Sequence, residues 1–133
     1  MMRASFRRGT TAVEFAVIST VLLMLICTAV DLGLLYLAQQ ALNIGVAQAV
    51  RYAAVSSTSS SVASITSRFV AAVTPALGAA RAGSCQVGVS FSPKNTPGGS
   101  VTVQATLVWH PLIDFDYMPS VTLSDSQSLV IQH

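Results

Sequence analysis

Residues 7–15 read Arg-Arg-Gly-Thr-Thr-Ala-Val-Glu-Phe, and an apolar run follows them at once from Ala16 to Val30. A basic leader therefore ends in a glycine, and an acid follows shortly after that glycine. An α-helix rises about 1.5 Å per residue, so about 20 apolar residues cross the roughly 30 Å hydrocarbon core of a bilayer. The stretch predicts a transmembrane helix.

The charges around this helix predict its orientation. Arg3, Arg7 and Arg8 precede it, and the next positive charge is Arg51. The positive-inside rule places the N-terminus in the cytoplasm and the rest of the chain outside. A conventional cleaved signal peptide fits less well, because the small-residue pattern at residues 47–49 lies too far downstream of the apolar run.

Glu14 is the unexpected residue in this segment. An ionised carboxylate at the edge of hydrocarbon is costly unless it is paired, so an acid within a membrane span is a functional candidate. Two ordinary explanations also remain open. Glu14 could be solvated at the level of the lipid headgroups, or it could be a first-turn acid favoured by the helix dipole.

Gly9 followed by Glu14 and Phe15 resembles the class III signal of type IV prepilins, with glycine before the scissile bond, glutamate fifth after it and an aromatic residue sixth. Residues 7–17, together with Asp-Leu-Gly at 31–33 and Ala-Val-Arg-Tyr-Ala at 49–53, resemble the TadE-like minor pseudopilins of tight-adherence (Tad, Flp) pili. The resemblance covers residues 7–55 well, and the C-terminal half is similar only in style.

The resemblance implies cleavage after Gly9 by a prepilin peptidase, so that the mature chain begins at Thr10. It also implies that Glu14, with Phe15 beside it, neutralises the N-terminal amine of a neighbouring subunit during assembly. The implied partners are the prepilin peptidase, other pilin or pseudopilin subunits, the inner-membrane Tad assembly platform and membrane lipid. The implied location is the bacterial inner membrane, with the C-terminal domain outside and incorporation into an extracellular pilus. The implied role is in pilus assembly and surface adhesion.

Composition argues against several other classes of protein. Charged residues make up only 9% of the chain. Lys and Arg number seven against five acids, and without the three arginines of the leader only four basic residues remain, so there is no basic nucleic-acid footprint. His110 with Asp114 and Asp116 follows no established metal or catalytic spacing. We therefore expect no enzyme activity, metal or cofactor, and we expect no disulfide between Cys27 and Cys85.

The helix is predicted to continue beyond the membrane to residue 55. Asp31 would lie near the outer boundary, either as an interfacial acid or as a contact to a partner helix. Beyond it, small residues recur every four positions at Ala41, Gly45, Ala49 and Ala53. Such a stripe lets two backbones approach closely. It could pack against the chain's own C-terminal domain or against another subunit.

The remaining chain predicts a small mixed domain. A Ser-rich loop at residues 56–61 precedes a short helix at 62–73, capped by Ser61 or Ser64 and ended by Pro75 and Gly78. Apolar residues then alternate with polar ones in 85–92 and 101–109, which predicts a hairpin. Residues 121–132 predict a third strand, broken near 125–127 by a bulge or by a turn into a fourth.

Taken together, these features predict an α+β, pilin-like fold. It has a long N-terminal transmembrane and stalk helix, a short second helix and an antiparallel sheet of three or four strands packed on helix. The predicted divisions are the leader 1–9, the stalk helix 10–55, the loop and short helix 56–83, and the sheet region 84–133. A different interpretation is an uncleaved, membrane-anchored binding or adhesin domain. The Gly9–Glu14 signal argues against it, because a simple anchor needs neither residue.

Overall fold

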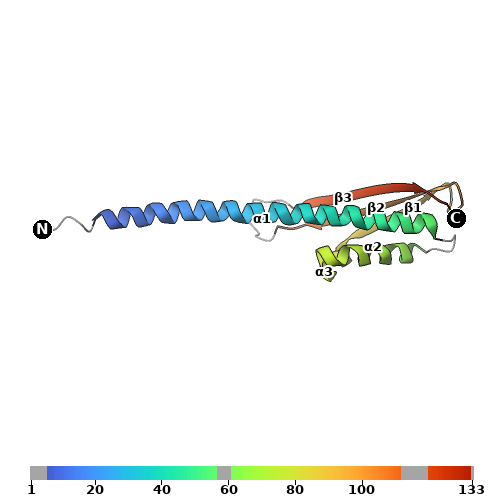
Figure 1. Cartoon of the computed structure of the whole chain (residues 1–133), viewed down its shortest axis with the longest axis horizontal. Coiled ribbons are helices and arrows are strands. Elements are labelled where there is room, and N and C mark those ends of the chain that lie inside the picture. The colour runs from blue at the N-terminus through green and yellow to red at the C-terminus, as the bar shows by residue number, and fades with distance from the viewer. Residues whose placement is uncertain (1–5, 57–60, 112–119, 133) are drawn as a thin grey trace. The chain divides into compact units, whose positions relative to one another are not determined.

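A computed structural model describes residues 6–56, 61–111 and 120–132 of this chain. Along the sequence the elements are α1 (Phe6–Val55), α2 (Val62–Leu77), α3 (Ala79–Ser84), β1 (Gln86–Ser92), β2 (Ser100–Trp109) and β3 (Val121–Val130) (Figure 1). The predicted α+β class is confirmed, with a long apolar N-terminal helix, shorter helices and a three-stranded antiparallel sheet.

The chain divides into two compact units, Met1–Leu34 and Leu35–His133, here called unit 1 and unit 2. The described part of unit 1 is helix alone, because α1 begins at Phe6 and continues past Leu34. Unit 2 holds the second part of α1 together with every other described element. A core can therefore form only in unit 2.

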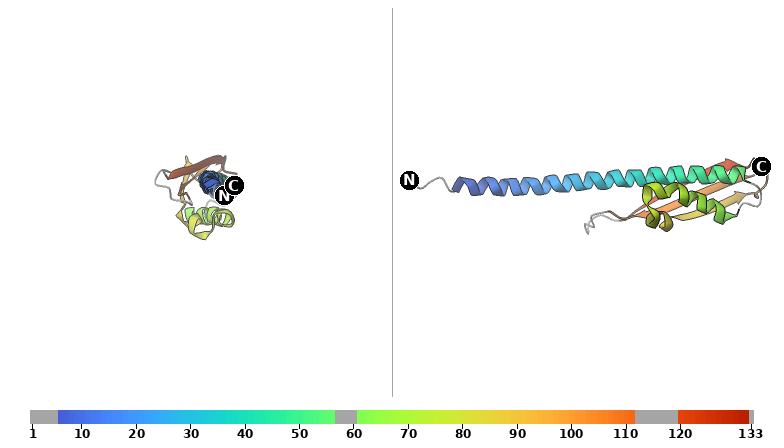
Figure 2. Two further views of the ribbon diagram at one scale, coloured as in Figure 1. Left: turned by 90° about the vertical axis from the view of Figure 1, so that its left-hand side faces the viewer. Right: turned by 60° about the horizontal axis from the view of Figure 1, so that its bottom comes forward.

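Within unit 2, α1 buries a face of mostly small side chains. The buried residues follow helical spacing and are Ala38, Ala41, Leu42, Gly45, Val46, Ala49, Val50, Ala53 and Ala54. Helix α2 buries Ile65, Phe69 and Val73 fully, and Phe69 and Val73 lie against Gly45 of this face. Figure 2 shows α1 and α2 side by side, with the strands of the sheet next to them.

Helix α2 begins where the sequence predicts and ends later. The Ser61 side chain accepts a hydrogen bond of 3.3 Å from the Ser64 backbone N–H, which confirms the predicted cap. Proline does not end the helix at residue 75 as predicted, because Pro75 lies in the last turn and the helix continues to Leu77. The Thr74 hydroxyl donates to the Val70 carbonyl at 2.6 Å. Gly78, at φ 77°, ends α2, and the short helix α3 that follows was not predicted.

The sheet has the order β1-β2-β3, with both pairs antiparallel. Alternate residues of β2 are buried, namely Val101, Val103, Ala105, Leu107 and Trp109. The matching residues of the edge strand β1, which are Val87, Val89 and Phe91, are half-buried. The other face of all three strands is polar or exposed, so α1 and α2 cover only one side of the sheet.

Strand β3 is continuous, which corrects the predicted break near residues 125–127. Its register with β2 runs without interruption from Val121 to Val130. Polar residues on its covered face have hydrogen-bond partners, since Gln127 Nε2 donates to Asp125 Oδ2 at 3.2 Å and to the Asn43 carbonyl of α1 at 3.5 Å. A strand can therefore carry two polar residues toward the helix without a bulge.

Hydrogen bonds also hold β3 and the residues after it alongside α1 within unit 2. Gln39 Nε2 donates to the Ser124 carbonyl at 3.3 Å, and the Gln132 N–H donates to the Ala54 carbonyl at 3.0 Å. The two elements therefore run in the same direction along unit 2. The second bond satisfies one of the carbonyls that the C-terminal end of α1 would otherwise leave open.

Candidate processing and assembly segment

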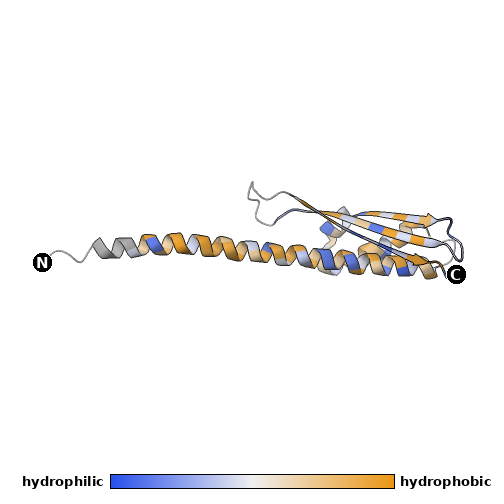
Figure 3. Ribbon diagram, turned by 90° about the horizontal axis from the view of Figure 1, so that it is seen from above, coloured by the Kyte–Doolittle hydropathy of each residue, from blue (hydrophilic) through white to orange (hydrophobic). Residues whose placement is uncertain are grey.

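From Thr11 to Val30, α1 is mostly apolar and has no buried residue. Figure 3 shows the apolar residues of α1 by their orange colour. In the most apolar 18-residue segment of α1, no residue is buried. The large side chains from Val13 to Val30 are exposed, including Phe15 at 73%. Exposed apolar surface of this extent is unfavourable in water. By length and composition, α1 is a candidate membrane span, consistent with a membrane-anchored protein.

The hydroxyl groups in this part of α1 are satisfied by the helix itself. Ser19 and Thr20 both donate to the Ala16 carbonyl, at 3.0 and 2.8 Å, and Thr28 donates to the Met24 carbonyl at 2.9 Å. Side chains that bond to their own helix backbone can enter a lipid environment without another partner. These three residues therefore do not compromise the span.

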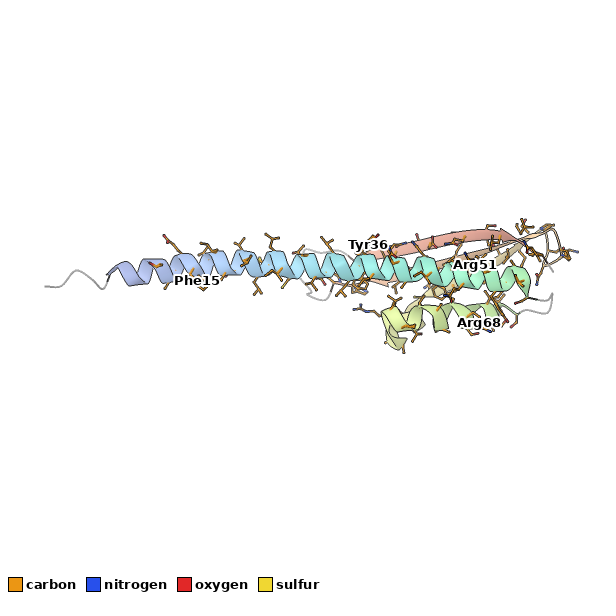
Figure 4. The ribbon with its side chains drawn as sticks, in the orientation of Figure 1. Phe15, Tyr36, Arg51 and Arg68 are labelled. Atoms are coloured by element: carbon orange, nitrogen blue, oxygen red, sulfur yellow. The ribbon has the colours of Figure 1, made fainter. Side chains whose placement is uncertain are left out.

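Glu14 differs from those hydroxyl residues. Its side chain is exposed, and it is the only charged residue between Thr11 and Val30. Among residues 11–56, 61–111 and 120–132, no hydrogen bond or ion pair involves its carboxylate. Phe15 follows it with an exposed ring, labelled in Figure 4. An acid and an aromatic side chain are thus both available to an outside partner at the start of the span.

Gly9 and Thr10 lie in the first turns of α1. Only the backbone of these two residues is described, and it is helical. The peptide bond expected to be cleaved therefore lies within the helix, and Thr10 precedes Glu14 by four residues. A helical turn has 3.6 residues, so residues 10 and 14 lie on the same face, one above the other.

Asp31 is buried, with 8% of its surface exposed. It also has an interaction partner within the chain. Its assignment as an interfacial acid or as a contact to a partner helix stays a prediction. Its burial sets it apart from Glu14, the other acid of unit 1.

The stripe of small residues in α1 packs inside unit 2. Ala41, Ala49 and Ala53 have between 0% and 5% of their surface exposed. A Cβ atom placed on Gly45 would lie 2.9 Å from Cε2 of Phe69 and would also meet Val73. Of the two alternatives for this stripe, the structure supports packing against the chain's own domain, and these four residues are covered without a second subunit.

The histidine and cysteine residues form no site in the described chain. His110 is exposed, whereas Asp114, Asp116 and His133 lie outside the described residues. No group of three or more potential metal ligands occurs among the residues that were described. Cys27 and Cys85 are free. Burial raises the pKa of the Cys85 thiol, whose Sγ lies 3.5 Å from the Arg81 carbonyl.

Sequence reasoning missed the environment of Trp109. The Arg81 guanidinium lies over the Trp109 ring, with Cζ 4.5 Å from the ring centroid, and Arg68 lies 5.0 Å from the Tyr52 ring in the same manner. Arg81 belongs to α3, which had no periodic pattern from which to predict it. Both arginines therefore lie over aromatic rings within unit 2.

These features define an α+β protein whose described residues include one candidate membrane span, at the N-terminal end. The family model described as TadE-like protein matches residues 9–51. This match confirms the resemblance to the TadE-like family over that segment. No curated protein and no solved structure matches the chain. The matched segment begins at Gly9 and lies wholly within α1.

Proposed function

We propose that this protein is a minor pilin or pseudopilin of a Tad-type pilus, inserted with its N-terminus in the cytoplasm and cut after Gly9 by a prepilin peptidase. The observation that carries the proposal is the Gly9–Glu14 spacing at the start of an uncovered apolar helix. An anchor alone needs an apolar helix but neither the glycine nor the acid. The family match, which begins at Gly9, supports the same conclusion.

Cleavage has a physical consequence for the helix. It removes Arg3, Arg7 and Arg8, which hold the N-terminus in the cytoplasm, and it creates an amine at Thr10. The new N-terminus lies at the positive end of the helix dipole, so an unpaired amine there is unfavourable in a lipid environment. A carboxylate from outside the chain would offset that cost.

Glu14 of a neighbouring subunit supplies this carboxylate in the proposed assembly. Its side chain is exposed and has no partner among the described residues. A charge pair in hydrocarbon is stabilising mainly because either charge alone would be very unfavourable there. Within one chain, Glu14 also lies one turn from Thr10, so an internal pair competes with the one between subunits. Packing of the exposed apolar side chains of neighbouring helices then favours the contact between subunits.

The protein is thus proposed to be a substrate of an enzyme and a structural component, with no catalytic role of its own. The test is to shear pili from cells that carry Glu14→Gln and to measure this protein in the sheared and membrane fractions. Thr20→Val is the matched control, since the Thr20 hydroxyl bonds only to its own helix. We expect Glu14→Gln to stay in the membrane and Thr20→Val to leave with the pili. Equal release of both variants would contradict the proposed role of Glu14.

A further inference from the structure

The uncovered face of the sheet in unit 2 has an unusual chemistry. Its outward residues are Gln86, Gly88, Ser90 and Ser92 in β1, Ser100, Thr102, Gln104, Thr106 and Val108 in β2, and Thr122, Ser124, Ser126, Ser128 and Val130 in β3. Every one is a hydroxyl, amide, glycine or valine residue, and none is charged. Soluble protein surfaces usually mix charges of both signs at about a quarter to a third of positions.

The cross-strand register assembles these groups into continuous rows. Ser90, Thr102 and Ser128 are neighbours across the sheet, and so are Gln86, Thr106 and Ser124. Hydroxyl and amide groups each donate and accept hydrogen bonds. The face therefore offers donors and acceptors in close alternation without a net charge.

Two adjacent hollows lie on this face and share Thr106. The first, of about 350 Å³, is lined by residues that include Gln86, Thr122 and His110. The second, of about 340 Å³, is lined by Gln104, Ser124 and their neighbours. Both volumes fall at the lower end of the range of roughly 300–1,000 Å³ found for small-ligand sites.

The linings favour one class of ligand. Val108, 52% exposed, gives the first hollow an apolar patch among its hydroxyl and amide groups. Among the described residues, Asp125 is the one acid that lines the second hollow, and its carboxylate accepts a hydrogen bond from Gln127 on the covered face of the sheet. No described lysine or arginine lines either hollow. Phosphates and acidic polymers therefore find no opposite charge, and apolar peptides find too little apolar surface.

From these observations we propose that the outward face of the sheet binds a neutral, hydroxyl-rich glycan across the two hollows that share Thr106. Sugar hydroxyls pair with the Ser, Thr and Gln groups, and the C–H face of a sugar ring packs on Val108. Because the contacts are exposed, one chain binds weakly. This inference goes beyond the proposed role in pilus assembly and does not depend on it.

The test uses the full chain in detergent micelles and saturation-transfer NMR. Maltohexaose, cellohexaose and chitohexaose are the neutral probes, and a hexamer of galacturonate is the acidic probe. We expect saturation of at least one neutral probe and none of the acidic one. Saturation of the acidic probe alone, or of no probe, would overturn the proposal.

A matched pair of variants locates the contact. Thr106→Val removes the hydroxyl that both hollows share, whereas Thr102→Val makes the same change on the same strand and face, outside both hollows. Valine is isosteric with threonine and suits a strand, so both variants should fold. We expect about a five- to ten-fold loss of affinity for Thr106→Val, as for one lost hydrogen bond, and less than about a two-fold loss for Thr102→Val. Equal losses would contradict the assigned position.

Discussion

Gly45 of α1 lies so close to Phe69 of α2 that a Cβ atom on the glycine would be 2.9 Å from Cε2 of the ring. The contact joins two segments that the Ser-rich loop separates in sequence. Because α2 packs on the stripe of small residues in α1, that stripe is not available to another subunit. The same contact gives a direct test of the packing.

Gly45→Ala should destabilise unit 2 by about 1–3 kcal/mol, because the added methyl group forces Phe69 and Val73 to move in a packed core. Trp109 is the single tryptophan and is buried in this unit, so its fluorescence during thermal unfolding measures the change. Gly83→Ala is the control. A Cβ there meets nothing within 4 Å, so the better helix propensity of alanine should leave stability unchanged or raise it. A neutral result at Gly45 would show that α2 does not pack there.

Arg81→Gln should alter the fluorescence of Trp109 and lower stability by about 0.5–1 kcal/mol, because the guanidinium lies over the indole ring at 4.5 Å. Arg68→Gln removes an equivalent contact with Tyr52 and should leave the tryptophan spectrum of the folded protein unchanged. If both variants gave the same spectrum as the unaltered protein, Arg81 would not lie over Trp109.

Ser61→Ala should destabilise α2 by about 0.5–2 kcal/mol, because the side chain caps the first turn of the helix through the Ser64 N–H. Ser67→Ala provides the comparison, since its hydroxyl bonds only to the Ser64 carbonyl within the helix and its loss should cost less. Thermal unfolding followed by circular dichroism measures both. A larger effect at Ser67 than at Ser61 would be inconsistent with the cap.

Cys85 should react slowly with iodoacetamide in a Cys27→Ser background. Burial raises the pKa of its thiol, and the thiolate is the form that reacts. The control is an exposed cysteine introduced as Ser90→Cys in a chain that lacks Cys85. The reaction rate of Cys85 should rise only at a higher pH than the rate of this control cysteine. The folded state holds this proton more tightly than the unfolded state. The stability that this thiol contributes is therefore present at neutral pH and is lost as pH rises through the raised pKa. Coincident pH profiles for the two cysteines would contradict the burial.

Local patterns predicted much of the fold. The apolar face of α1, the spacing of Ile65, Phe69 and Val73, and the alternation in β1 and β2 all follow from burial on one face of a regular element. What was missed depends on contacts between distant segments. The Asn43 carbonyl that accepts from Gln127 lies far away in sequence, so nothing near residues 125–127 indicated that the strand would continue.

The candidate sites divide in the same way. Gly9 and Glu14 can be found from sequence because their spacing is a local signal. The hollows around Thr106 depend on the register that sets Gln86 and Ser124 beside it. The alternation of Ser and Thr in β2 and β3 was a partial signal, since it placed these residues on one face. It could not show where that face is hollowed.

The central claim is that this protein is a processed pilin-like subunit, and the mass of its N-terminal peptide tests that claim most directly. The protein would be isolated from membranes of cells with and without the prepilin peptidase. We predict a chain that starts at Thr10 when the peptidase is present and a chain that keeps Arg7 and Arg8 when it is absent. The same intact N-terminus in both would contradict processing after Gly9, and the protein would then be a membrane-anchored domain outside the pilus.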